Sequence, residues 1–136
     1  MGVYKELEET FNYDIVDEFL DHFEMMCSAM EPTILHTRDP EFYKREIEEL
    51  FRMLHNIKSA TGFLRLETMH RTAGFVENLL EECRKLEGPA TEELVNWLLL
   101  VSDQFNRWLD DLHKDAPEYA KLDMKIMETP VELETK

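Results

Sequence analysis

A histidine and a lysine stand three residues apart in the stretch FRMLHNIKSATGF, and small residues follow them directly. Imidazole is a nucleophile that is partly neutral near pH 7, since the ordinary pKa of a histidine side chain is about 6.5. A lysine one helical turn away is a cation that can offset the charge of an anionic group. His55 and Lys58 therefore have the types and spacing for nucleophilic group transfer, provided that the fold leaves the imidazole within reach of a partner.

The helical repeat predicts where His55 lies relative to the core. Each residue of an α-helix advances by ~100°, which puts His55 ~120° from the centre of the apolar stripe of its helix. We expect it on a flank of the helix, with Arg52, Ser59 and Gly62 as neighbours one or two turns away. The stripe itself consists of Ile47, Leu50, Leu54, Ile57 and Thr61.

A glutamate on the next helix has a similar position. Glu77 is expected ~80° from the apolar stripe of its helix, again on a flank. Gly74 lies one turn before it. Because glycine inside a helix costs ~1 kcal/mol relative to alanine, Gly74 indicates either a close approach or an exposed, tolerant position.

Four segments have apolar residues at spacings of three and four, the pattern of amphipathic helices. They cover residues 13–35, 40–62, 67–87 and 91–114. Helices of this length with short connections favour an all-α fold, an antiparallel up-and-down four-helix bundle. We expect a short N-terminal helix or cap in residues 1–12, the bundle in 13–114, and a loosely held tail or linker in 115–136, with a short helical piece near 119–127.

Proline and glycine predict the ends of these helices. Pro32 is expected to kink or end the first helix, because proline lacks a backbone donor and clashes with the preceding turn. Asp39 and Pro40 have the types of an N-cap and a first helical residue, so the second helix is expected to begin there. Gly62 and the Gly88–Pro89 step are expected to end the second and third helices.

Composition narrows the class of partner. The 136 residues correspond to one domain, and their formal net charge is −15, which disfavours nucleic acid and anionic membrane surfaces. We therefore expect a protein partner. We also expect a monomeric chain.

The sequence has no apolar run long enough to span a bilayer and no signal peptide, so we expect a cytoplasmic location. In that reducing compartment, Cys27 and Cys83 are expected to be buried thiols.

The string His55-x-x-Lys58-Ser59-Ala60-x-Gly62 resembles the pattern of the histidine-containing phosphotransfer (HPt) domain. The run ENLLEECR, which begins at Glu77, is similar in particular to the phosphotransfer domain of the chemotaxis histidine kinase CheA. This similarity covers most of the chain. It implies an antiparallel four-helix bundle whose second helix carries a phosphorylated histidine.

The resemblance also implies roles for individual residues. His55 would be the phosphoacceptor, Lys58 the cation near the phosphoryl oxygens, and Glu77 the acceptor of a hydrogen bond from Nδ1 of His55. A response-regulator receiver or a histidine kinase would be the partner. The partner would bring Mg²⁺ and ATP, since this chain has no nucleotide-binding motif and is expected to bind no cofactor of its own. The chain would act as a phosphocarrier without hydrolysing ATP. It would be free-standing or the phosphotransfer part of a kinase. The residues expected to contact the partner are Arg52, Ser59, Gly62, Phe63, Arg65 and Gly74.

The chain departs from the family pattern at two positions. Arg65 stands where the turn between the second and third helices usually has glycine, which would alter the turn or add a cation near the site. Gly74 stands where chemotaxis-type domains have a second histidine on the third helix.

Other interpretations remain open at this point. A degenerate, non-phosphorylated bundle would use the same face to bind a partner, and a dimerisation module would use an apolar patch of Tyr43, Phe63, Leu64 and Phe75. Glu67-x-x-His70 has the spacing of a di-iron ligand pair, but the sequence has no second copy, so we expect no metal. We expect His22, His36, His70 and His113 at the surface or half-buried.

Overall fold

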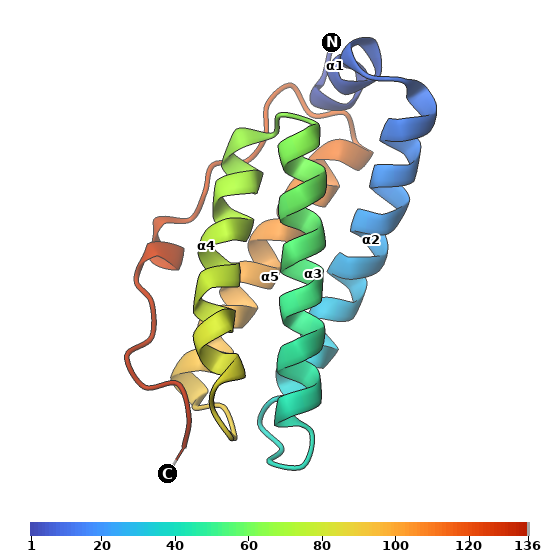
Figure 1. The fold of residues 1–136 in the computed structure, drawn as a ribbon. Coiled ribbons are helices and arrows are strands. Elements are labelled where there is room, and N and C mark those ends of the chain that lie inside the picture. Colours follow the sequence, from blue (N-terminus) through green and yellow to red (C-terminus); the bar gives the residue numbers. More distant parts are fainter. Residues whose placement is uncertain (136) are drawn as a thin grey trace.

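The computed structural model describes residues 1–135, and the four-helix bundle expected from the sequence is confirmed. Each of the long helices α2 to α5 runs antiparallel to the one before it, and α1 lies across one end of them (Figure 1). α3 packs against α4 and α2, and α2 packs against α5. The elements are α1 (Val3–Thr10), α2 (Tyr13–His36), α3 (Tyr43–Phe63), α4 (Glu67–Arg84), α5 (Glu92–His113) and the short 3₁₀-helix η1 (Met124–Met127).

The apolar stripes of the four long helices meet in one core. All five stripe residues of α3 are buried, as the periodicity predicts. The aromatic residues Phe23, Phe105 and Trp108 are fully buried in this core, with Phe105 packed edge-on against the other two rings. Cys27 and Cys83 are buried free thiols as expected, and burial raises the pKa of each to about 12.

Pro32 does not end α2, which continues to His36, close to the end of the predicted segment 13–35, and Pro32 lies on the exposed side of the helix. The start of α3 differs from the prediction. α3 begins at Tyr43 and not at Asp39. The carboxylate of Asp39 accepts a hydrogen bond from the amide of Glu41, at 2.9 Å, and so caps a turn that precedes the helix.

The third long helix also ends earlier than predicted. α4 stops at Arg84, before the Gly88–Pro89 step is reached. The amides of Glu87 and Gly88 both donate to one carboxylate oxygen of Glu134, at 3.0 Å, so the tail of the chain holds this loop. Helical periodicity does not predict contacts between segments so far apart in the sequence.

The turn between α3 and α4 has a left-handed residue, Arg65, at φ 59°. The amide of Arg65 donates to Gly62 and the amide of Leu66 donates to Thr61, which is the hydrogen-bond pattern of a Schellman motif. Arg65 therefore adopts the conformation for which glycine is usually used there. The substitution leaves the turn intact and adds an exposed guanidinium, whose Cζ lies 5.9 Å from the ring centroid of Phe11.

The prediction of a loosely held tail is wrong for the described residues. Two buried tryptophans of α5 donate from Nε1 to tail carbonyls at 2.8 Å, Trp97 to Ile126 and Trp108 to Ala120. Gln104 accepts from the amide of Asp123 at 2.7 Å and donates to a further tail carbonyl. The tail thus runs back along α5 to the opposite end of the bundle (Figure 1), and the expected short helical piece is present as η1.

The start of this tail also fastens α1. The carboxylate of Asp115 accepts from the amides of Tyr4, at 3.0 Å, and Lys5, at 3.1 Å, and the amide of Val3 donates to Ala116 at 2.8 Å. α1 has no side-chain cap of its own. Asp115, which follows α5 in the sequence, therefore caps the first turn of α1.

Candidate functional site

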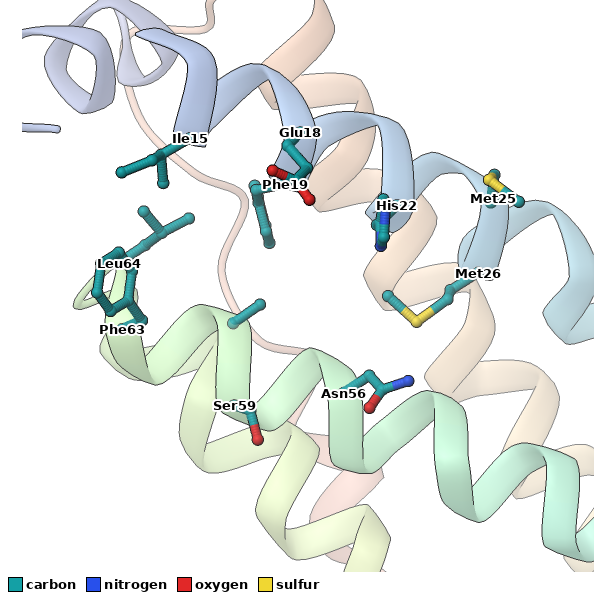
Figure 2. A pocket seen from close by; sticks show the side chains of 11 residues that line it. Ile15, Glu18, Phe19, His22, Met25, Met26, Asn56, Ser59, Phe63 and Leu64 are labelled. Carbon is teal, nitrogen blue, oxygen red and sulfur yellow. The ribbon is translucent and has the colours of Figure 1, made fainter. Parts of the chain in front are cut away.

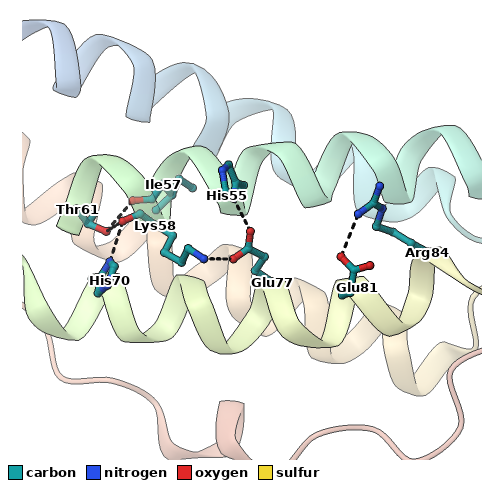
Figure 3. Close-up of polar contacts among 8 residues, drawn as sticks. All are labelled: His55, Ile57, Lys58, Thr61, His70, Glu77, Glu81 and Arg84. Carbon is teal, nitrogen blue, oxygen red and sulfur yellow. Dashed lines mark hydrogen bonds and ion pairs between the residues drawn. The ribbon is translucent and has the colours of Figure 1, made fainter. Parts of the chain in front are cut away.

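His55, Lys58 and Glu77 come together on the exposed side of the α3–α4 pair, as the sequence interpretation requires (Figure 3). Nδ1 of His55 donates to one carboxylate oxygen of Glu77, at 2.6 Å, and Nζ of Lys58 lies 2.5 Å from the other. The side chain of His55 is 54% exposed. Since Nδ1 is held toward α4, the lone pair of Nε2 is available on an accessible ring.

Glu77 is more deeply placed than the helical rotation indicates. Its side chain is only 9% exposed because α3 covers the flank on which it lies. Burial opposes ionisation, but the hydrogen bonds from Lys58 and His55 outweigh it and hold the pKa of Glu77 below its usual value. Glu77 is therefore a charged carboxylate near neutral pH, held by two donors.

A phenylalanine and an arginine that the sequence interpretation did not identify complete the surroundings of the imidazole. The ring of Phe51 lies nearly parallel to that of His55, with 6.4 Å between centroids. Cζ of Arg84 lies 4.3 Å from the centroid of Phe51, and Arg84 pairs with Glu48 at 2.7 Å and with Glu81 at 3.0 Å. Phe51 is one turn before His55, so its spacing was a usable signal. The position of Arg84 over Phe51 depends on how α3 packs on α4, and residue spacing along the sequence does not predict that packing.

The two glycines of the candidate site make room for side chains of this chain itself. A Cβ on Gly62 would lie 2.9 Å from the imidazole of His70, whose Nδ1 donates to the carbonyl of Lys58 at 2.8 Å. A Cβ on Gly74 would meet Cδ of Lys58 at 3.4 Å. Gly62 therefore admits His70, whereas Ser59, one helical turn after His55, is exposed.

A groove of about 560 Å³ lies between α2 and α3, on the side of α3 that faces away from α4 (Figure 2). Of the residues expected to contact a partner, Ser59 and Phe63 line it, and Phe63 is 61% exposed. The opposite wall comes from α2 and includes Met25, which is 71% exposed. The groove is mainly apolar, with Ile15, Phe19, Met26 and Leu64 among its lining residues.

The other expected contact residues lie outside this groove. Arg52 is exposed and paired with Glu49 at 2.6 Å. Arg65 lines a second cavity, of about 450 Å³, between the beginning of α4 and the tail. Gly62 and Gly74 face the α3–α4 seam. The set expected from sequence thus divides over several places on the molecule.

The patch predicted for a dimerisation module does not form. Tyr43 is fully buried and donates its hydroxyl hydrogen to the carbonyl of Cys83, at 2.9 Å, and Leu64 is 3% exposed. Phe75 is half-buried against Trp97. Of the four residues, Phe63 remains exposed, because the other three point inward from their helices.

The remaining histidines are exposed or half-buried, as expected. Within residues 1–135, no three histidine, cysteine, aspartate or glutamate side chains gather in a way that would hold a metal ion. None of the helices described in that range is both long and apolar enough to cross a membrane.

Comparisons with known proteins give a family for the chain. It is 26% identical over 105 residues to the chemotaxis protein CheA of Salmonella typhimurium, an alignment that covers 77% of this chain and 16% of that protein. The chain thus spans less than a fifth of the length of this curated relative. No solved structure matches it. A family model described as the Hpt domain matches residues 14–115, which include nearly all of the four long helices and the three site residues, so the chain belongs to the Hpt domain family.

Proposed function

We propose that this chain is a histidine phosphocarrier in two-component signalling. His55 accepts a phosphoryl group from a histidine kinase or from the phospho-aspartate of a receiver, and passes it to a response-regulator receiver. The observation that carries the proposal is the 2.6 Å hydrogen bond from Nδ1 of an exposed imidazole to a buried carboxylate. Membership of the Hpt domain family supports the same reaction.

The chemistry follows from the acceptor character of Glu77. A carboxylate only accepts hydrogen bonds, so the proton of a neutral His55 is held on Nδ1 and the lone pair stays on Nε2. With the phospho-aspartate of a receiver as donor, Nε2 forms its bond to phosphorus as the bond from phosphorus to the aspartate oxygen breaks, and the carboxylate leaves with that electron pair. With a kinase and ATP, the bond that breaks is the one from the γ-phosphorus to the bridging oxygen, and ADP leaves with the electron pair. The imidazolium that results keeps its Nδ1 proton against the charge of Glu77.

Lys58 would offset the charge of the phosphoryl group. In the resting chain its ammonium is paired with Glu77 at 2.5 Å. A dianionic phosphoryl group on Nε2 would compete with Glu77 for that ammonium, because a charge-assisted hydrogen bond to phosphate is among the stronger polar contacts. Lys58 then acts as a point cation that either anion can share.

The partner would supply the remaining parts of the reaction. We propose that the chain binds no cofactor and that Mg²⁺ and ATP come with the kinase or receiver, in the cytoplasm. The receiver would dock over the groove between α2 and α3, where Ser59 and Phe63 lie on the same helix as the reactive ring. Arg52, Gly62, Arg65 and Gly74 would contact it only at the margins of that interface.

Phosphoryl labelling tests the proposal directly. The wild-type chain, His55→Gln and the matched control His113→Gln are incubated with a phosphorylated receiver, or with a cognate kinase and ATP, and acid-labile, base-stable phosphate is measured. His113 is exposed at the end of α5 and does not line the groove. We expect labelling of wild type and His113→Gln and its loss in His55→Gln.

Two results would contradict the proposal. Equal labelling of wild type and His55→Gln would move the phosphoacceptor elsewhere. No labelling with any cognate partner, combined with binding of that partner to the groove, would favour the non-phosphorylated interaction bundle instead.

A further inference from the structure

A second histidine pairs with a buried glutamate at the other end of α3. Nδ1 of His36, the last residue of α2, lies 3.1 Å from Oε2 of Glu46 in the first turn of α3. The side chain of Glu46 is 11% exposed and that of His36 is 61% exposed. The pair therefore has the arrangement seen at His55 and Glu77, with an accessible ring oriented through Nδ1 by a buried carboxylate.

The surroundings of the two rings also correspond. The second carboxylate oxygen of Glu46 lies 3.3 Å from Nε of Arg45. In the same way, the second carboxylate oxygen of Glu77 is bound by Lys58. The ring of Phe42 lies 6.2 Å from that of His36, and Cζ of Arg45 lies 4.6 Å from the Phe42 centroid. At His55, Phe51 likewise lies beside the imidazole, and Arg84 lies over the ring of Phe51.

The other histidines outside the site have no such arrangement. Within residues 1–135, His22 has no hydrogen-bond partner on its ring. His113 approaches Glu24 through Nε2, at 3.7 Å, and that glutamate is half exposed. Nδ1 of His70 donates to the backbone carbonyl of Lys58, so this half-buried ring is oriented by a neutral group and not by a carboxylate. Among the described residues, orientation of an exposed imidazole through Nδ1 by a buried carboxylate is therefore found at His55 and His36.

We propose that His36 is a second phosphoacceptor, which takes a phosphoryl group on Nε2 from donors of the phosphoramidate or acyl-phosphate class. The carboxylate of Glu46 holds the proton on Nδ1 and leaves the lone pair on Nε2. Nε2 forms the bond to phosphorus, the donor's bond from nitrogen to phosphorus breaks, and ammonia leaves with that electron pair when phosphoramidate is the donor. The Nδ1 proton stays in its hydrogen bond to Glu46.

The guanidinium of Arg45 is the cation at this second site. It is 67% exposed and bound to Glu46, so it can turn toward an added phosphoryl group without leaving a buried position. Glu46 and His55 lie about two and a half helical turns apart on α3. A phosphoryl group at His36 would thus be separate from the one at His55, at the end of the bundle where α2 meets α3.

Chemical phosphorylation tests this inference without a partner protein. The full chain carrying His55→Gln is incubated with phosphoramidate at mildly alkaline pH, and phosphohistidine is followed at each position by mass spectrometry and ³¹P NMR. We expect His36 to be labelled about tenfold faster than His22 in the same molecule, because a carboxylate that orients a histidine through its other ring nitrogen raises the basicity of that ligand and contributes ~10–100-fold at metal sites. The added Glu46→Gln should bring the His36 rate down to that of His22.

Ring-nitrogen NMR provides a second measurement that does not depend on reactivity. Neutral His36 should show the tautomer protonated on Nδ1, and His22 the mixture typical of a free imidazole. Equal labelling of His36 and His22, or an unchanged His36 rate in a folded Glu46→Gln chain, would overturn the inference. If Glu46→Gln fails to fold, the ratio of His36 to His22 in the parent chain decides. Kinase labelling of His55 is scored separately, so either proposal can fail alone.

Discussion

Glu77 joins His55 to Lys58 through its two carboxylate oxygens, so its charge links the nucleophile to the cation. Its pKa in the folded chain lies below the ordinary value of 4.5, because the two hydrogen bonds outweigh the effect of burial. A carboxylate with a lowered folded pKa stabilises the fold above its unfolded pKa, and this stabilisation disappears as the pH falls through the folded value.

The first prediction concerns the acid sensitivity that follows. At pH 7, Glu77→Gln should lower the free energy of unfolding by about 1–3 kcal/mol, because the charge-assisted hydrogen bonds that this buried side chain accepts from His55 and Lys58 are weakened or lost. The difference from wild type should be full above the unfolded pKa of about 4.5 and shrink as the pH falls further. Urea unfolding at a series of pH values measures it, with Glu31→Gln, an exposed position, as the control. A difference independent of pH would mean that Glu77 acts only through packing.

The juxtaposition of His55, Lys58 and Glu77 was predictable from sequence, whereas their surroundings were only partly so. His55 and Lys58 belong to one motif with fixed spacing, and Glu77 was assigned through the resemblance to the HPt domain. The roles of Gly62 and Arg84 depend on which turn of α4 lies against which turn of α3, and amphipathic periodicity does not report that register. Gly62 was therefore expected to contact a partner, although the ring of His70 lies against it.

At the scale of the element, the two glycines on the α3–α4 seam should respond in opposite ways to the same change. Gly62→Ala should lower the free energy of unfolding by about 1–3 kcal/mol, because its Cβ would lie 2.9 Å from the ring of His70. Gly74→Ala should raise it by up to ~1 kcal/mol, since alanine favours the helix and the 3.4 Å approach is to the flexible chain of Lys58. Thermal unfolding of both variants tests the pair.

A third variant separates the clash from other effects of Gly62→Ala. Adding His70→Ala should recover most of the lost stability, since the Cβ would then have room. If the double variant is no more stable than Gly62→Ala, the cost lies in the backbone of α3 and the assignment of Gly62 to His70 is wrong.

The turn after α3 makes a separate prediction about Arg65. Its φ of 59° is a left-handed conformation that costs a non-glycine residue roughly 1 kcal/mol. Arg65→Gly should therefore raise the free energy of unfolding by about 0.5–1 kcal/mol, less whatever the contact with Phe11 contributes. Arg71→Gly, at an exposed position inside α4, is the control and should lower it by ~1 kcal/mol. Equal losses in both variants would show that Arg65 holds the turn by its side chain.

Element positions were predictable because each long helix buries a stripe with a period near that of the α-helix, and the boundaries were less so. Asp39 and Pro40 have the residue types of a helix start, but Asp39 caps the preceding turn. α4 ends at Arg84 because the following loop is bound by Glu134. In both cases a local signal was outweighed by other contacts of the folded chain.

At the scale of the whole molecule, the tail acts as a further layer on the bundle. The buried tryptophans Trp97 and Trp108 direct their indole hydrogen bonds to it. A loosely held tail was expected from the sequence, since sequence patterns do not show which backbone carbonyls a distant indole will use.

Truncation after Lys114 is the corresponding prediction. It removes several hydrogen bonds to α5 and the cap on α1, at about 1 kcal/mol each before the entropy of the freed tail is counted. We expect a free energy of unfolding lower by about 2–4 kcal/mol and a red shift of tryptophan fluorescence. The single variant Trp97→Phe, which loses one of these bonds, is the control. Unchanged stability in the truncated chain would mean that the tail is only apposed to the bundle.

The hydrogen bonds of Asp115 and Ala116 with α1, here called the clamp, also determine how the molecule would carry a tensile load. The N-terminus lies at one end of the bundle and the last described residues lie at the other (Figure 1). Force applied between these ends passes from α1 through Asp115 and Ala116 into the tail, and then along it. The helix pair that holds His55 lies outside this path, so stretching the chain end to end would strain the clamp and tail before it disturbed the reactive imidazole.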